Sequence, residues 1–218
     1  TALWLKDYET ADLCYCTILS MFDWAVGPDG DYLDKQPFVM YAVRYALPFI
    51  YIYNRYKGET SYPAKLEKIA MALIDIDPNA AIRAPMLLAA ASSRNSLLQS
   101  FAMNVYNQND RYLPWFMLTD FLWSCLFYDP TVKPALFVDD DVLKIKGVRH
   151  YQYSGYVAAG SFMSTQKPKL LLYAGPHSGK SDFDQGLITV YFRGETLLGK
   201  PFTRNIGYLN AHQWVAHY

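Results

Sequence analysis

The chain has 218 residues, which is enough for one large domain or two modest domains with a substantial core. Its 20 basic residues balance its 20 acidic residues, and this balance argues against a nucleic-acid-binding protein, which normally carries a basic excess. Aromatic residues make up 17% of the chain, including 19 Tyr, so these rings either line a surface or cleft or pack in a Tyr-rich core.

The first 134 residues have the periodicity of helices. Apolar residues recur there at three- and four-residue spacing, and breakers such as Gly27-Pro28 and Asp129-Pro130 separate the periodic segments. The predicted helices cover residues 13–24, 38–53, 66–74, 85–91, 97–106 and 113–126. Their short connections predict antiparallel helix pairs that pack side by side.

After Pro134 the pattern changes to short runs of β-branched and aromatic residues between Gly and Pro turns. The predicted strands cover residues 137–139, 142–145, 156–162, 169–173, 187–192 and 196–198. Such a series is typical of an antiparallel β-sandwich. We therefore predict an α+β fold with a helical domain at 1–134 and a β-sandwich domain at 135–218, with the boundary near residues 133–136.

The chain has three cysteines, Cys14, Cys16 and Cys125. Cys14 and Cys16 are two residues apart in a predicted helix, so they point to different faces and do not suit a shared metal. We predict three buried thiols, with a disulfide as the less favoured alternative.

No apolar run is long enough to cross a membrane, because charges and prolines interrupt each candidate. The first residues of the given sequence do not have the pattern expected of a signal peptide. The first residues already have a helical pattern, which predicts either a mature product or a piece of a longer protein.

The stretch from Gly175 to Ser181 has the composition of a phosphate-binding loop, but three residues rather than four separate its first glycine from the Gly179-Lys180 pair. A phosphate loop also needs a helix directly after it, since the helix N-terminus supplies the N–H donors. The residues that follow, LITVYFRGETLL, predict a β-hairpin instead. Nucleotide binding is therefore excluded for this loop.

Short motifs follow one another through the strand-rich part of the chain. They are Ser154-Gly155-Tyr156, Ala174-Gly175-Pro176, Asp184-Gln185-Gly186 and Gly194-Glu195-Thr196-Leu197-Leu198. In order and spacing they resemble the heparinase II/III-like family of polysaccharide lyases. Ala211-His212-Gln213 is similar to a later family segment, and the helical part resembles the family through Asp29-Gly30, residues 38–45 and residues 126–130.

The resemblance implies a helical α/α toroid followed by an antiparallel β-sandwich, and β-elimination in a uronate-containing polysaccharide or oligosaccharide. In that reaction a base removes the proton beside the uronate carboxylate, whose charge must be neutralised by fixed donors or cations. A Tyr hydroxyl commonly protonates the leaving oxygen. If a Tyr is also the base, nearby positive charge must lower its pKa. A secreted or periplasmic location follows from the resemblance, with a cytoplasmic one as the alternative.

The chain departs from the family pattern at two places. Positions where family members carry histidines, some holding a structural metal, are Lys180 and Asp182 here, so we predict no metal and no cofactor. The family's helical part also supplies an Asn and a His for the substrate carboxylate, but no histidine precedes His150 in this chain. Either a missing N-terminal portion or a partner copy supplies this Asn and this His, or the chain is a divergent or inactive member that lacks them.

The candidate catalytic residues are Tyr41, Tyr45 and His177. Tyr41 and Tyr45 are four residues apart on one helix face, where one of them donates a proton to the leaving group or orients the sugar. The alternative for both is a helix-packing tyrosine. His177 lies in a turn between strands and is a candidate base, with an exposed turn histidine as the alternative.

The candidate substrate-binding residues are Lys180, Asp182, Asp184 and His212. Lys180 would neutralise the uronate carboxylate, or else is an exposed turn lysine. Asp182 and Asp184 share a face if their segment is extended, and they either contact the sugar or make structural hydrogen bonds. His212 is a candidate through the family resemblance alone.

Two other functions stay open at this point. One is a non-catalytic carbohydrate-binding relative that has lost the catalytic histidines. The other is a toroid glycoside hydrolase, which needs two carboxylates flanking the bond. Asp34 and Asp120 are available for that role, although their spacing gives it no support.

Overall fold

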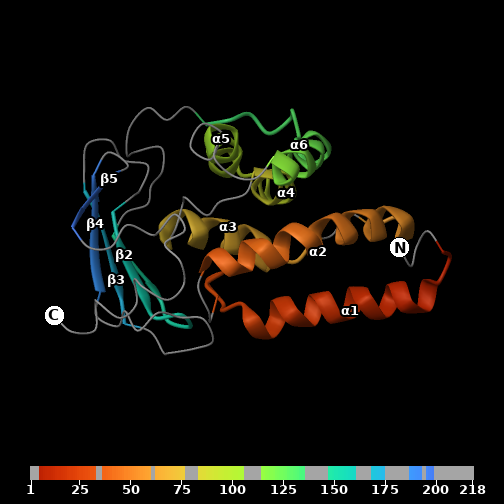
Figure 1. Cartoon of the computed structure of the whole chain (residues 1–218), viewed down its shortest axis with the longest axis horizontal. Helices are drawn as coiled ribbons and strands as arrows, with labels where there is room; N and C mark the ends of the chain where they lie inside the picture. The colour runs from red at the N-terminus through yellow and green to blue at the C-terminus, as the bar shows by residue number, and fades with distance from the viewer. Residues whose placement is uncertain are drawn as a thin grey trace.

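The computed structural model describes residues 5–32, 36–59, 62–76, 83–105, 114–135, 147–160, 168–174, 187–192 and 195–198. Within them the fold is α+β, with six helices followed by a five-stranded antiparallel sheet (Figure 1). The helices are α1 (Tyr8–Ala25), α2 (Gln36–Lys57), α3 (Lys65–Ile76), α4 (Arg83–Ser93), α5 (Ser96–Val105) and α6 (Pro114–Phe127). The strands are β1 (Val148–Tyr151), β2 (Tyr156–Ala159), β3 (Lys169–Tyr173), β4 (Leu187–Phe192) and β5 (Glu195–Leu198).

The six predicted helices are confirmed, with ends that differ by a few residues from the predicted ones. Strands β3 and β4 have the predicted bounds, and β2 and β5 overlap their predictions. Strand β1 was not predicted, because Val-Arg-His-Tyr offers neither apolar alternation nor a β-branched run. The strands predicted at 137–139 and 142–145 lie outside the described residues, and the domain boundary near 133–136 stays a prediction.

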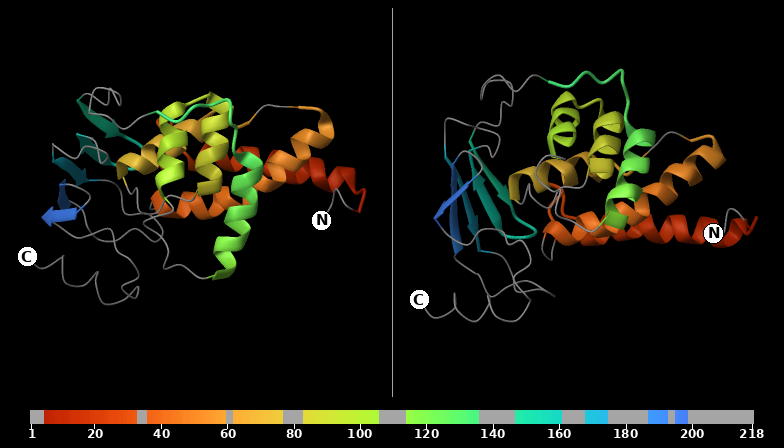
Figure 2. Two further views of the ribbon diagram at one scale, coloured as in Figure 1. Left: turned by 90° about the horizontal axis from the view of Figure 1, so that it is seen from above. Right: turned by 45° about the horizontal axis from the view of Figure 1, so that its top comes forward.

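The helices pack around one apolar core. Helix α4 is apolar on all sides and lies against both α5 and α6, as expected for a central helix. The core continues into α2 and α3 through residues such as Leu47, Ile50 and Leu73, which are fully buried. In Figures 1 and 2, α4, α5 and α6 lie on one side of α2 and α3, whereas α1 lies on the other. Among the described helices, none combines the length and the apolar character that crossing a membrane requires.

Many tyrosines lie between α1 and α2. Tyr15 stacks on Tyr53 with ring centroids 4.2 Å apart, and Tyr8 stacks on Tyr56 at 5.1 Å. The hydroxyl of Tyr53 donates to Asp12 at 2.7 Å. Part of the aromatic content therefore packs between helices, as one of the two interpretations of the composition predicts.

The prediction of buried cysteines is wrong. All three thiols are free and exposed. Helix α1 buries the stripe that contains Ala11, Phe22 and Ala25, and Cys14 and Cys16 lie away from it. Cys125 lies on the exposed side of α6. Apolar character made burial the natural expectation, but the geometry of the helix faces decides the exposure of each thiol.

Lys65 binds the C-terminal end of α1. Its Nζ donates to the carbonyl oxygens of Phe22 at 3.1 Å, Asp23 at 2.9 Å and Val26 at 2.7 Å. Carbonyls in the last turn of a helix have no partner within the helix, and the helix dipole favours a cation there. Lys65, at the start of α3, therefore fixes the point where the chain leaves α1.

Replacing Lys65 with methionine is expected to lower the free energy of unfolding by roughly 1–2 kcal/mol, because three carbonyls lose a charged donor while the apolar stem is kept. Urea unfolding measures the change. Lys133→Met is the matched control, since Lys133 is exposed and its replacement should leave stability nearly unchanged. Equal effects of the two replacements would contradict the capping role.

The sheet is a meander in which each strand pairs with the next along the chain. Alternate residues of β2 and β3 are buried, as the two-residue period of a strand predicts. Their buried face carries Tyr156, Ala158 and Leu171, which pack with Ala72 and Ile76 of α3. The end of α3 therefore joins the helices to the sheet through a second apolar cluster.

Candidate functional site

Three segments that are far apart in the sequence meet beside the sheet. They are residues 27–32 after α1, the turn at residues 152–155 between β1 and β2, and Ala174 directly after β3. We call these residues the junction. The carboxylate of Asp31 accepts hydrogen bonds from the backbone N–H and the hydroxyl of Ser154, at 2.7 and 2.9 Å. Ala174 N–H donates to the carbonyl of Gly155 at 2.8 Å, so the contacts are continuous from Asp31 to the end of β3.

Two glycines in the loop before Asp31 allow the loop backbone to lie very close to neighbouring residues. Gly30 has a φ of +87°, and a Cβ there would lie 2.1 Å from the backbone carbon of Lys68. A Cβ on Gly27 would lie 2.3 Å from Asp31 Oδ1. The turn is closed by Gly27 N–H donating to the carbonyl of Asp31 at 2.7 Å. Only glycine fits these two positions, and together they hold Asp31 against the sheet.

The Asp31 side chain has no exposed surface, and Ser154 is almost fully buried. Both Ser154 donors reach the same oxygen of Asp31, Oδ2. A hydrogen bond to a carboxylate is roughly twice as strong as a neutral one. Nearby, the hydroxyl of Tyr153 donates to the carbonyl of Trp24 at 2.6 Å, which adds a second link between the turn and α1.

A second polar cluster joins α3 to the sheet. Arg149 donates to both carboxylate oxygens of Asp75, with Nη2 at 2.8 Å from Oδ1, and Tyr151 donates to Oδ2 at 2.5 Å. Lys169 Nζ donates to the carbonyl oxygens of Asp75 and Ile74 in the last turn of α3. Asp75 and Lys169 are almost fully buried. A buried carboxylate in such a cluster needs both the opposite charge and the hydrogen bonds.

Tyr151 acts in this cluster as a neutral donor. Burial is the main cause that raises the pKa of its hydroxyl far above the usual value, and the negative charge of Asp75 raises it further. A tyrosine base requires the opposite shift. The Asp75 cluster binds the sheet to α3, and the raised pKa of Tyr151 does not suit this hydroxyl to proton abstraction.

The predicted site residues fall into three groups. Tyr45 lies on α2 with 63% of its surface exposed, so it does not pack in the core as a helix-packing tyrosine would. Tyr41 lies one turn earlier on the same helix, and its side chain is outside the described residues. The other candidates also lie outside the described residues, and they are His177, Lys180, Asp182, Asp184 and His212.

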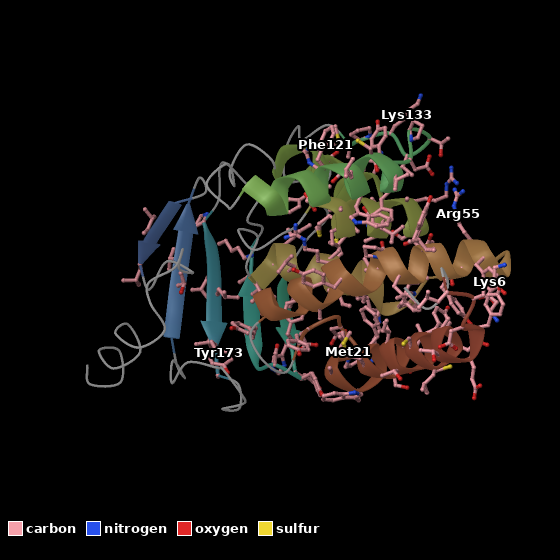
Figure 3. All side chains as sticks on the ribbon, turned by 45° about the vertical axis from the view of Figure 1, so that its right-hand side comes forward. Lys6, Met21, Arg55, Phe121, Lys133 and Tyr173 are labelled. Carbon is pink, nitrogen blue, oxygen red and sulfur yellow. The ribbon has the colours of Figure 1, made fainter. Side chains whose placement is uncertain are left out.

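The described residues on either side of 175–186 locate the ends of that segment. Tyr173 and Leu187 are register partners at the ends of β3 and β4, and Tyr173 also pairs with Tyr156. Ala174, the last described residue before the segment, is held by Gly155 of the junction. Figure 3 shows Tyr173 at the sheet, whereas Lys6 and Arg55 lie at the opposite end of the helices. The segment with four candidate residues thus begins at the junction.

Sequence reasoning named Ser154 only as part of a motif, and it missed the other residues that build the junction and the Asp75 cluster, namely Asp31, Asp75, Arg149, Tyr151 and Lys169. A signal was present for two of them. Asp75 interrupts the apolar run of residues 72–76, and Lys169 opens the apolar run of β3 on its buried face. A charge within an apolar run indicates a buried ion cluster, although it does not identify the partner.

Asp120 of α6, the carboxylate considered for a hydrolase, has a structural role. It accepts a hydrogen bond from the backbone N–H of Ala84, near the start of α4, at 3.1 Å. Burial raises its pKa, while the Ala84 N–H and the charges of Arg44 and Arg83 lower it by less. The carboxylate satisfies one of the N–H groups that the first turn of a helix leaves open. Asp34, the other carboxylate, lies outside the described residues.

Asp120→Asn is expected to change the pH dependence of stability. Because the pKa of Asp120 is raised above 3.8 in the folded state, the folded protein binds the proton more tightly, and ionisation costs stability as pH rises from 3.8 to the raised pKa. Asparagine keeps an acceptor for Ala84 N–H without this cost. The stability of the variant relative to the unaltered protein should therefore increase with pH above about 4. Urea unfolding of both proteins across pH 3–7 measures the difference, and a pH-independent difference would contradict the assignment.

Compared with known proteins, the chain matches no family model, no curated protein and no solved structure. Across the described ranges, no group of three or more His, Cys, Asp or Glu side chains lies together in a way that could hold a metal ion.

Proposed function

We propose that this protein is a polysaccharide lyase that cleaves a uronate-containing polysaccharide or oligosaccharide by β-elimination. One observation carries the proposal. The motif pairs Asp29-Gly30 and Ser154-Gly155, which are part of the resemblance to the heparinase II/III-like family, lie together through the Asp31–Ser154 hydrogen bonds. The third motif begins at Ala174, which is bonded to Gly155. Asp31, which follows the first motif, Ser154-Gly155 of the second and Ala174, the first residue of the third, thus lie close together, which supports a shared site.

The same proposal gives the fold its finer class. In this proposal the six described helices form part of an α/α toroid, and the described five-stranded sheet forms one layer of a β-sandwich. The contact between α3 and the buried face of the sheet supports this arrangement, since it places the helical part beside the sheet rather than at the end of a linker. The proposed substrate site lies between α2 and the connection from β3 to β4.

Each site residue has a proposed task in the elimination. His177 removes the proton beside the uronate carboxylate, and Tyr41 protonates the leaving oxygen. Lys180 neutralises the carboxylate, without which that proton is too weakly acidic to be removed. Tyr45 orients the sugar, and its exposure on α2 makes it accessible to a ligand. Asp182, Asp184 and His212 bind the sugar hydroxyls.

The charge of the protein favours one kind of substrate. With 20 basic and 20 acidic residues, the chain has no excess positive charge for a long, strongly sulfated polymer. We therefore propose a uronate polymer of lower charge as the substrate. The proposed place of action is outside the cell or in the periplasm. The proposed chemistry calls for no cofactor or metal.

The test is incubation with a panel of uronate polysaccharides, followed by the absorbance of the unsaturated uronate product. A lyase gives this absorbance. New reducing ends without absorbance indicate a hydrolase, and binding without either product indicates a non-catalytic carbohydrate-binding protein. Each of the last two results, or no interaction with any member of the panel, would overturn the proposal. The hydrolase is the weaker competitor, because Asp120 caps α4.

A further inference from the structure

We infer that the exposed face of α2 binds a chain of anionic sugars, in addition to the sugar at the proposed site. The face consists of Tyr45, Ile52 and Tyr56, which we call the α2 stripe. The inference rests on the proposed function for its ligand, a uronate chain. It deepens that function, because a stripe along a helix holds several sugars at once and so suits a long chain.

The three side chains of the α2 stripe lie along one line of the helix. Ile52 follows Tyr45 by seven residues and Tyr56 follows it by eleven, and these spacings correspond to two and three helical turns on one face. The exposed fraction is 63% for Tyr45, 47% for Ile52 and 50% for Tyr56. At 1.5 Å per residue, the two tyrosines are roughly 16 Å apart along the helix axis. Helix α2 runs away from the sheet, so Tyr56 lies near its far end (Figure 1).

The ring at the far end of the stripe is held in place. Tyr56 stacks on Tyr8 of α1, with ring centroids 5.1 Å apart and planes inclined by 8°. A side chain that is already held loses less conformational entropy when a ligand binds. A held, exposed tyrosine offers a flat apolar face and a hydroxyl, and a sugar ring has apolar C–H faces and hydroxyls that match them. The stripe therefore suits a carbohydrate better than a flexible apolar patch would.

The charges of α2 favour an anionic chain. The helix carries Arg44, Arg55 and Lys57 and contains no acidic residue. By helical position, the two arginines border one side of the stripe and Lys57 borders the other. The Nζ of Lys57 lies 5.7 Å from the ring centroid of Tyr56, and it pairs with Asp12 of α1. Figure 3 shows Arg55 at the end of the helices that lies away from the sheet. A uronate carboxylate on the stripe would thus lie beside cations of α2.

The experiment measures dissociation constants by titration calorimetry. The ligands are oligogalacturonate and oligomannuronate, each as a disaccharide and as a chain longer than the stripe. Every protein carries Tyr41→Phe, which slows cleavage during the titration. The test variants are Tyr56→Ala and the pair Ile52→Asp and Ile52→Asn. Phe121→Ala is the matched control, since Phe121 is an aromatic residue of α6 with the same exposed fraction as Tyr56.

The longer chain is expected to bind more tightly than the disaccharide. Tyr56→Ala should weaken binding of the longer chain by about threefold to tenfold, the usual value of one aromatic contact, and should leave the disaccharide unaffected. Ile52→Asp should weaken it more than Ile52→Asn, because only aspartate repels a uronate. That difference should disappear at about 1 M salt, where exposed charges are screened. Phe121→Ala should change neither affinity.

Unchanged affinity for the longer chain in Tyr56→Ala and Ile52→Asp would overturn the inference, as would an equal loss in Phe121→Ala. If Tyr56→Ala does not fold, the Ile52 pair decides the outcome alone. Self-association, or binding to phosphatidylserine vesicles, that these variants abolish without a change in sugar affinity would assign the stripe to a second copy or to a lipid surface and overturn the inference.

The proposed function and the stripe fail in different ways. Lyase activity with unchanged affinities in the stripe variants overturns the stripe and leaves the lyase. Binding of the longer chain through the stripe without any unsaturated product from the unaltered protein overturns the lyase and leaves the stripe. An unaltered protein that neither cleaves nor binds any oligouronate overturns both.

Discussion

Replacing Tyr41 with phenylalanine is expected to lower kcat on the cleaved polymer by roughly 10²–10⁴-fold, the usual contribution of a general acid. The hydroxyl is the proposed proton donor to the leaving oxygen, and phenylalanine keeps the ring while it removes the proton. The measurement is the initial rate of unsaturated product formation at saturating substrate. KM should change much less than kcat, since the proton is needed only as the bond breaks.

Two controls separate this effect from a loss of structure. Tyr128→Phe removes a hydroxyl from a partly exposed tyrosine after α6, and its kcat should equal that of the unaltered protein. The free energy of unfolding of Tyr41→Phe should stay close to that of the unaltered protein. A Tyr41→Phe variant that keeps most of its activity would remove Tyr41 from the mechanism and would leave Tyr45 as the candidate donor.

Asp75→Ala is expected to lower the free energy of unfolding by about 3–5 kcal/mol, the usual loss when a buried ion pair loses one partner. Arg149 and Tyr151 would lose their shared acceptor at the contact between α3 and the sheet. Urea or thermal unfolding measures the loss.

The double variant Asp75→Ala, Arg149→Met provides the control for that prediction. Removing both charges should recover part of the stability lost by Asp75→Ala, because no uncompensated guanidinium is then left at the interface. If Asp75→Ala lowers the free energy of unfolding by less than about 1 kcal/mol, the Asp75–Arg149 pair stabilises the protein no more than an exposed surface ion pair does. That result would contradict the expectation from the burial of Asp75.

The helical elements and most strands could be predicted from local patterns. Apolar spacing located the six helices of the described residues, and Leu-rich or β-branched runs located β3 and β4, since both signals arise from burying one face. Strand β1 was not predicted, because its inward side chains, Arg149 and Tyr151, bind Asp75 and do not pack in an apolar core. A strand held by an ion cluster lacks the apolar alternation that indicates a strand.

The polar contacts of the junction and of the Asp75 cluster could not be predicted, because they join residues that are distant in the sequence. Ser154 lies 123 residues after Asp31, and Arg149 lies 74 residues after Asp75. The sequence around each of these residues does not indicate which distant residue it binds. The motifs Asp29-Gly30 and Ser154-Gly155 lie in two of the segments that meet at the junction, but Asp31, which makes the contact with Ser154, follows its motif and was not singled out.

Of the candidate site, the structure confirms only the helix that carries Tyr41 and Tyr45, and the site itself stays a prediction. The four-residue spacing of Tyr41 and Tyr45 placed them correctly on one helix, and the exposure of Tyr45 agrees with a role at a surface. The tasks of the loop residues His177, Lys180, Asp182 and Asp184 stay predictions, as does that of His212. The position of Ala174, the last described residue before the loop, came from the pairing of the strands, which depends on three-dimensional contacts.

The most direct test of the central claim is a crystal structure of the Tyr41→Phe variant with a bound uronate oligosaccharide. We expect the sugar to lie in one trough bordered by Phe at position 41, by His177 and by Asp182, with the carboxylate of the uronate next to Lys180. A structure in which these residues border unrelated surfaces, with no trough between α2 and the connection from β3 to β4, would contradict the account.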